Sequence, residues 1–180
     1  MGVQYEVKKL DPEHWFVYKH LRLESLKNDP EAFIGIHEEK LKVSDDTWKN
    51  QFTTDHTRIL FLFEGVQAIG LAGYDINHNS KNAHVASIFG VYIMSDYRGK
   101  GLGKMLVSAV IDDIVKHHPQ IIKLKLAVSS SQTAAFHIYE SLGFNNIGTL
   151  KMEIKHGEEY FDEILLEKFI ATRNPPAVRP

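Results

Sequence analysis

The sequence predicts an α/β (α+β) fold in which strands and helices follow one another in the order β-α-α-β-β-β-α-β-α-β-β. Stretches rich in β-branched and aromatic residues, such as 87–94, have the composition of buried strands. Other stretches, such as 104–116, repeat apolar residues at helical spacing. The 180 residues, 43% hydrophobic and 24% charged, suit one domain with a single sizeable core. We expect that domain to span residues 1–170, followed by a loose, proline-containing tail at 171–180.

The N-terminal part is predicted to form one strand and two helices. Residues 3–9 alternate apolar and polar side chains, as a half-buried strand does. Asp11 followed by Pro12 is typical of a helix start, and this helix is expected to end at about Asn28. A shorter helix is expected to begin at Ser44.

The rest of the chain is predicted to form three strands, a helix, a strand, a short helix and a final hairpin. Gly143 is placed to end the short helix as a left-handed C-cap. The expected ranges are 57–63, 68–77 and 83–94 for the three strands, 104–116 for the helix, 121–128 for the next strand, 132–142 for the short helix, and 145–155 with 159–167 for the hairpin.

Composition argues against several classes of function. A net charge of −2 gives no support for nucleic-acid binding. No apolar run approaches the roughly 20 residues of a membrane span, and the N-terminus lacks a secretion signal pattern, so we expect no membrane partner. The sequence contains no cysteine, which excludes disulfides and thiolate metal sites, and its ten histidines show no metal-ligand spacing. A cytoplasmic protein without a bound metal is therefore expected.

The stretch 98–103 stands between a predicted strand and a predicted helix and contains three glycines. Such a turn presents unpaired backbone N–H groups and the positive end of the helix dipole to an anion, here expected to be a pyrophosphate. It fails the P-loop pattern, because Arg98 and Met105 occupy the positions of the first glycine and the hydroxyl residue. It also fails the Gly-x-Gly-x-x-Gly dinucleotide pattern. What remains, Arg-x-x-Gly-x-Gly, would by itself also suit an ordinary tight turn.

A second motif follows in the stretch 124–144, which contains a predicted strand and the short helix. Its spaced residues are Val128, Gln132, Ala135, Tyr139, Gly143 and Phe144. With these two motifs the chain resembles the GNAT family of acetyl-CoA-dependent N-acetyltransferases. The second motif of that family is usually written Val-x-x-x-Asn-x-x-Ala-x-x-x-Tyr-x-x-x-Gly-Phe, so this chain departs from it at Gln132. The resemblance implies a mixed, mostly antiparallel central sheet flanked by helices, acetyl-CoA as co-substrate, and an enzyme that forms homodimers in some members.

The resemblance also implies the residues that hold acetyl-CoA. Glycines at 101 and 103 would let the backbone approach the pyrophosphate, Arg98 and Lys100 could add charge, and the backbone of Tyr92 and Ile93 could pair with the pantetheine amides. The expected cofactor-binding residues are Tyr92, Ile93, Arg98, Gly99, Lys100, Gly101, Leu102, Gly103, Lys104, Gln132, Ala135, Phe136 and Tyr139.

Two catalytic roles are expected. Tyr139 matches the family tyrosine that lies near the thioester sulfur, so it is expected to be the general acid that protonates the coenzyme A thiolate. An alkyl amine of pKa about 10.4 must lose a proton before it attacks, which costs roughly 4.6 kcal/mol at pH 7 and favours a general base. That base is unassigned, and the candidates are Ser87, His84, Glu24 and Asp162. In the stretch 160–163, strand alternation separates Asp162 from Glu163, but the sequence does not tell which of them faces the substrate.

The function expected is transfer of the acetyl group of acetyl-CoA to a primary amine by direct attack. The alternatives are a non-catalytic acyl-CoA sensing module on the same fold, favoured by Ser87 where the family often has Glu, and an acetyltransferase for peptide or protein N-termini. The sequence does not identify the acceptor.

Overall fold

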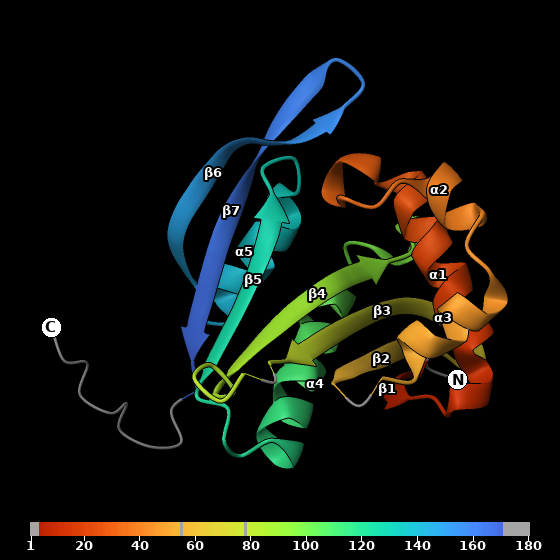
Figure 1. Cartoon of the computed structure of the whole chain (residues 1–180), viewed down its shortest axis with the longest axis horizontal. Coiled ribbons are helices and arrows are strands. Elements are labelled where there is room, and N and C mark those ends of the chain that lie inside the picture. The colour runs from red at the N-terminus through yellow and green to blue at the C-terminus, as the bar shows by residue number, and fades with distance from the viewer. Residues whose placement is uncertain (1–3, 55, 78, 171–180) are drawn as a thin grey trace, which may run out of the picture.

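A computed structural model describes residues 4–54, 56–77 and 79–170 (Figure 1). Its centre is a seven-stranded sheet with strand order β1-β2-β3-β4-β5-β7-β6. All neighbouring strands are antiparallel except β4 and β5, which are parallel. The strands are β1 (Tyr5–Lys9), β2 (Thr57–Glu64), β3 (Gln67–Ile76), β4 (Val85–Ile93), β5 (Lys123–Ser129), β6 (Asn145–His156) and β7 (Glu159–Phe169). The mixed, mostly antiparallel α/β fold predicted from the sequence is confirmed.

Five α-helices and three short 3-10 turns occur in the described residues. The helices are α1 (Trp15–Asn28), α2 (His37–Leu41), α3 (Asp45–Phe52), α4 (Leu102–His117) and α5 (Thr133–Ser141), and the turns are η1 (Pro12–His14), η2 (Pro30–Ala32) and η3 (Ser95–Tyr97). The short helix α2 and the turn η2 were not predicted. The expected tail at 171–180 lies outside the described residues.

The helix ends test the capping predictions. At the start of α3 the backbone N–H of Thr47 donates to the Ser44 hydroxyl (3.3 Å), as an N-cap requires. Asp11 makes no such bond, and the 3-10 turn η1 separates it from α1, so the predicted start of the first helix was about one turn early. Gly143 follows α5 with φ +83°, and its N–H donates to the carbonyl of Glu140 (2.9 Å), which confirms the left-handed cap.

Both faces of the sheet are covered, which explains why β2 is apolar along its whole middle. Its residues Ile59, Phe61 and Phe63 face α1 and α3, and the residues between them pack in the core formed with α4. Alternate side chains of a strand point to opposite faces, so a strand buried on both sides needs a continuous hydrophobic run. Within the described residues no helix is long and apolar enough to cross a membrane.

The parallel strands β4 and β5 pair only at one end and then separate, as Figure 1 shows. Their ladder joins Val85–Ser87 to Lys123–Lys125 and stops there. Beyond it β4 carries one extra residue relative to β3, with Gly90 at φ +64°. Such a β-bulge bends its strand and increases the local twist. The result is a wedge-shaped opening between the two halves of the sheet, with the backbone of β4 exposed along one edge.

Candidate active site

A cavity of 700 Å³ occupies the opening between β4 and β5. Its walls are β4 residues 88–93 and β5 residues 126–128. The rest of the lining comes from α5, the loop before α4, the segment 29–35, and single residues of α1, β6 and β7 (Arg22, Ile154 and Glu163). The segment 29–35, which includes η2, contacts α1 as well as strands β5 and β6. The volume lies within the range of about 300–1,000 Å³ typical of ligand pockets.

A second cavity of 460 Å³ adjoins the first and shares Phe33, Ile34, Gly35 and Ile154 with it. It lies between the segment 26–38 and the turn of the β6–β7 hairpin, where Glu38 and Glu153 contribute carboxylates. The first cavity therefore has a continuation toward the hairpin, lined by both apolar and charged side chains.

The loop before α4 places free backbone N–H groups at one end of the first cavity. Gly99 and Gly101 adopt φ of +76° and +78°, and Gly101 is the N-cap of α4. The first N–H bonded within the helix is that of Met105, which donates to the Gly101 carbonyl (3.2 Å). The N–H groups of residues 102–104 therefore lack helical partners and, together with the helix dipole, form an anion site.

Arg98 holds this loop to the segment that covers the cavity. Its guanidinium donates two hydrogen bonds to the carboxylate of Asp29, one of them 3.0 Å from Nη1, and Nε donates to the Ile93 carbonyl (2.9 Å). Asp29 is 13% exposed, and its carboxylate raises the pKa of Arg98. The charge of Arg98, expected to face a pyrophosphate, is thus directed at Asp29, while the backbone of its loop remains available.

Most of the expected cofactor-binding residues line the first cavity, and three do not. Those at the cavity are Tyr92, Ile93, Arg98, Gly99, Gly101, Leu102, Gly103, Gln132, Ala135 and Tyr139. Lys100, Lys104 and Phe136 lie outside the lining. Lys100 has its ammonium 5.0 Å from the centre of the Tyr97 ring.

Tyr139 and Gln132 reach the cavity from the second motif. Tyr139 is 5% exposed, and among the described residues its hydroxyl has no hydrogen-bond partner. Burial raises its pKa, so the hydroxyl stays protonated and can donate. The Gln132 amide donates to the Glu31 carboxylate (3.4 Å) and to Ser131 Oγ (3.3 Å), which connects α5 to η2.

None of the four proposed bases lines the cavity. Ser87 pairs with Lys125 at the closed end of the β4–β5 wedge, and His84 precedes that strand. Glu24 lies on α1. The carboxylate of Asp162 accepts hydrogen bonds from Lys151 Nζ (2.8 Å) and the Met152 N–H (3.0 Å), which lower its pKa and make it a weak base.

Glu163, the neighbour of Asp162, does line the cavity and was not among the sequence candidates. Burial, and then the nearby carboxylate of Glu153, raise the pKa of Glu163. The alternation of strand residues in the sequence predicts that Asp162 and Glu163 lie on opposite faces of the sheet. It does not predict which of the two faces the cavity. Orientation comes from pairing, since residues 123–129 of β5 and 163–169 of β7 lie side by side.

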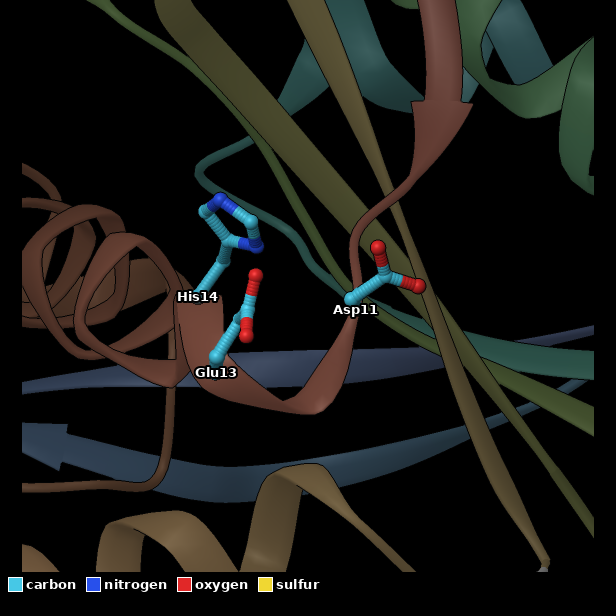
Figure 2. Close-up of side chains that lie close together, drawn as sticks. All are labelled: Asp11, Glu13 and His14. Atoms are coloured by element: carbon cyan, nitrogen blue, oxygen red, sulfur yellow. The ribbon is translucent and has the colours of Figure 1, made fainter.

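A group of potential metal ligands lies elsewhere. The side chains of Asp11, Glu13 and His14 offer atoms within 4.8 Å of one another around η1 (Figure 2). The two carboxylates are exposed, and none of the three residues lines either cavity. We assign this group no part in the site.

Comparison with known proteins identifies the family. The sequence model described as the acetyltransferase (GNAT) family matches residues 14–144, more than half of the chain. The chain belongs to the GNAT family. A ribosomal protein bS18-alanine N-acetyltransferase of Salmonella typhimurium is 38% identical over 60 residues, 33% of this chain and 39% of the relative's length. The L-amino acid N-acyltransferase MnaT of Escherichia coli K12 is 28% identical over 138 residues, 66% of this chain and 75% of MnaT.

The solved structures agree with the fold of a GNAT protein. The yncA structure from Salmonella typhimurium, described with its cofactor acetyl-CoA, superposes with a TM-score of 0.79 at 16% identity, over 98% of this chain and 99% of that one. The family resemblance inferred from the two motifs is confirmed by the match of the family model.

Proposed function

We propose that this GNAT protein transfers the acetyl group of acetyl-CoA to a primary amine, within the cavity between β4 and β5. The observation that carries the proposal is that one cavity is lined by Leu102 and Gly103, whose N–H groups lack helical partners, and by Tyr139, whose hydroxyl has no hydrogen-bond partner among the described residues. A ligand with a pyrophosphate at one end and a reactive thioester at the other suits that arrangement.

The backbone of the chain would do most of the work of holding acetyl-CoA. The N–H groups at the start of α4 would bind the pyrophosphate, and left-handed Gly101 keeps them pointing out of the helix. Along β4, residues beyond Ser87 have no strand partner on the β5 side. The backbone of Tyr92 and Ile93 can therefore pair with the pantetheine amides as an added strand would.

Glu163 and Tyr139 supply the two proton transfers in this proposal. The ionised carboxylate of Glu163 takes a proton from the acceptor ammonium, and the amine nitrogen then attacks the thioester carbonyl carbon. The carbon–sulfur bond then breaks, and the Tyr139 hydroxyl donates its proton to the leaving thiolate. The nitrogen loses its second proton as the amide forms, and uptake of a proton returns the Tyr139 phenolate to its neutral form. No covalent enzyme intermediate on cysteine is available, because the sequence contains none.

The acceptor in this proposal enters through the second cavity. That cavity shares Ile154 of the β6–β7 hairpin with the first cavity, which Glu163 of the same hairpin also lines. The names of the relatives describe acetylation of an alanine of a ribosomal protein and acylation of L-amino acids, which supports an α-amine as acceptor. The sensing-module alternative rested on Ser87, and the presence of Glu163 in the cavity removes its motivation.

Calorimetric titration with acetyl-CoA, followed by an assay of coenzyme A release over a panel of amines, tests the proposal. We expect saturable binding, and turnover with at least one primary amine. Gly101→Asp should abolish binding, because it adds a negative charge and an unfavourable left-handed residue at the anion site. Binding of acetyl-CoA to the variant as tight as to the parent would refute the proposed cofactor site.

A further inference from the structure

Arg22, on the cavity side of α1, has a charge that no acidic residue within the described ranges 4–54, 56–77 and 79–170 pairs with. Its side chain lines the first cavity, and burial lowers its pKa. Nη1 donates to Ser25 Oγ (3.2 Å), and the guanidinium carbon lies 4.6 Å from the centre of the Phe33 ring. These contacts fix the guanidinium in position, but a neutral hydroxyl and a ring do not neutralise it.

The other arginines of the described residues are each paired with a carboxylate. Arg58 lies 3.3 Å from Asp113, and Arg98 binds Asp29. Arg22 forms no ion pair within the described part of the chain. Arg22 therefore lacks the carboxylate partner that Arg58 and Arg98 have and that usually accompanies an arginine shielded from water.

An unpaired guanidinium in a cavity wall is costly to the folded protein. Arginine remains protonated in proteins, so it cannot escape the cost by losing its charge. Partial removal from water weakens its hydration without giving it a counter-ion. A planar guanidinium matches the two oxygens of a carboxylate, to which it can donate two parallel hydrogen bonds. Gly35 approaches this group closely: a Cβ there would lie 3.8 Å from Arg22 Nη2 and 3.2 Å from a methyl carbon of Leu26, so a side chain at this position would crowd the guanidinium.

We propose that Arg22 binds a carboxylate of the acceptor, so that the acceptor is an amino acid whose amine faces Glu163. This inference rests on the proposed function, since it assigns the second substrate of the same reaction. The two charged groups reach the cavity from separate elements, Arg22 from α1 and Glu163 from β7. Arg98 and Asp29, which also line the cavity, pair with each other, whereas Arg22 and Glu163 form no ion pair among the described residues. An unpaired cation and an unpaired carboxylate in one cavity complement a zwitterion, which offers a carboxylate and an ammonium to the same site.

The lining between these groups indicates the kind of side chain. Phe33, Ile34 and Ile154 border the passage to the second cavity, and they present apolar surface. Apolar contacts of this kind favour an aliphatic or aromatic side chain over a charged one. L-Leucine and L-phenylalanine are therefore the first acceptors to test.

The experiment compares each amino acid with its amide, which keeps the amine and side chain and removes the negative charge. Coenzyme A release is measured for L-leucine, L-leucinamide, L-phenylalanine and L-phenylalaninamide, with spermidine as an amine without carboxylate. The parent, Arg22→Met, Arg22→Lys and the same-helix control Lys19→Met are assayed. Lys19 is paired with Asp45 (2.7 Å) and lies outside both cavities.

We expect the parent to prefer the amino acids to their amides. Arg22→Met should lower kcat/KM for the amino acids by about 100-fold, mainly through KM, because a charge-paired contact is lost. It should leave the amides unchanged, Arg22→Lys should retain part of the preference, and Lys19→Met should behave as the parent. Acetyl-CoA affinity and melting temperature, measured on every variant, show whether Arg22→Met remains folded.

Three results would overturn the inference. The first is a parent protein that prefers the amides or spermidine to the amino acids. The second is an equal loss of activity toward amino acids and amides in both Arg22→Met and Arg22→Lys. The third is a folded Arg22→Met variant that binds acetyl-CoA much more weakly than the parent. The last result would place the cofactor, not the acceptor, at Arg22. A parent that neither binds acetyl-CoA nor acetylates any amine would instead contradict the proposed function itself.

Discussion

The substitution Glu163→Gln distinguishes a catalytic role of this carboxylate from a structural one, because a catalytic role predicts lower activity with unchanged or higher stability and a structural role predicts lower stability. In the folded protein, burial and the carboxylate of Glu153 raise the pKa of Glu163. The folded state therefore holds this proton more tightly than the unfolded chain does, and ionisation at neutral pH costs folding free energy. Glu163→Gln should thus melt at the same temperature as the parent or higher at pH 7. The difference should disappear below the ordinary pKa of Glu, about 4.3.

The activity of the same variant should fall. With the amine of a free amino acid such as leucine, of pKa about 9.6, the free base is scarce at pH 7 by a factor of roughly 400, equivalent to about 3.5 kcal/mol. A general base typically contributes about 10²- to 10⁴-fold, so we expect kcat at pH 7 to drop by at least about 100-fold. Without the base, the variant depends on free amine from solution, which increases about tenfold per pH unit. The deficit should therefore shrink by about 100-fold between pH 7 and pH 9.

The assay is initial-rate coenzyme A release from pH 5 to pH 9, with thermal melting on the same samples. In the parent, the rate should fall as pH drops through the raised pKa of Glu163, because only the ionised form accepts a proton. The reasoning is refuted if Glu163→Gln retains the parent's rate at pH 7, or if its deficit is the same at pH 7 and pH 9.

Three further predictions follow from the geometry of the site. Tyr139→Phe should lower kcat at least about tenfold. It should weaken neither acetyl-CoA binding nor stability, because the buried hydroxyl has no hydrogen-bond partner in the described structure. A variant with a lower melting temperature would contradict this prediction. Asp29→Asn should cost about 1–2 kcal/mol of unfolding free energy, or roughly 3–6 °C in Tm, because the Arg98 guanidinium is 43% exposed and the pair is only partly buried. Additive effects of Asp29→Asn and Arg98→Met in a double-mutant cycle would exclude this coupling. Gly101→Ala should cost about 1–2 kcal/mol from left-handed strain although the space around it is open, whereas Gly148→Ala, also in open space but without positive φ, should be neutral in the same chemical denaturation.

Local sequence patterns were sufficient to predict those parts of the site that are formed by a single segment of the chain. The loop 98–103 and the strand and helix of the second motif each carry their glycines, caps and apolar spacing within about 20 residues. Their positions in the structure agree with the prediction because neighbouring residues determine them.

Features that depend on pairing between distant segments were not predictable in this way. The choice between Asp162 and Glu163 depends on the register of β7 against β5, and the opening of the sheet depends on an extra residue in β4 relative to β3. The roles of Arg22 and Asp29 were likewise hidden, since both lie on or after the first helix among residues of similar polarity. Only the fold shows that Asp29 binds Arg98 and that Arg22 has no acidic partner among the residues that the structure describes.

The structure of the protein crystallised with acetyl-CoA tests the central claim most directly. We predict the pyrophosphate within hydrogen-bond distance of the N–H groups of residues 102–104, the pantetheine along Tyr92 and Ile93, and the thioester sulfur beside the Tyr139 hydroxyl. Acetyl-CoA bound elsewhere, or with its thioester away from Tyr139 and Glu163, would contradict the account.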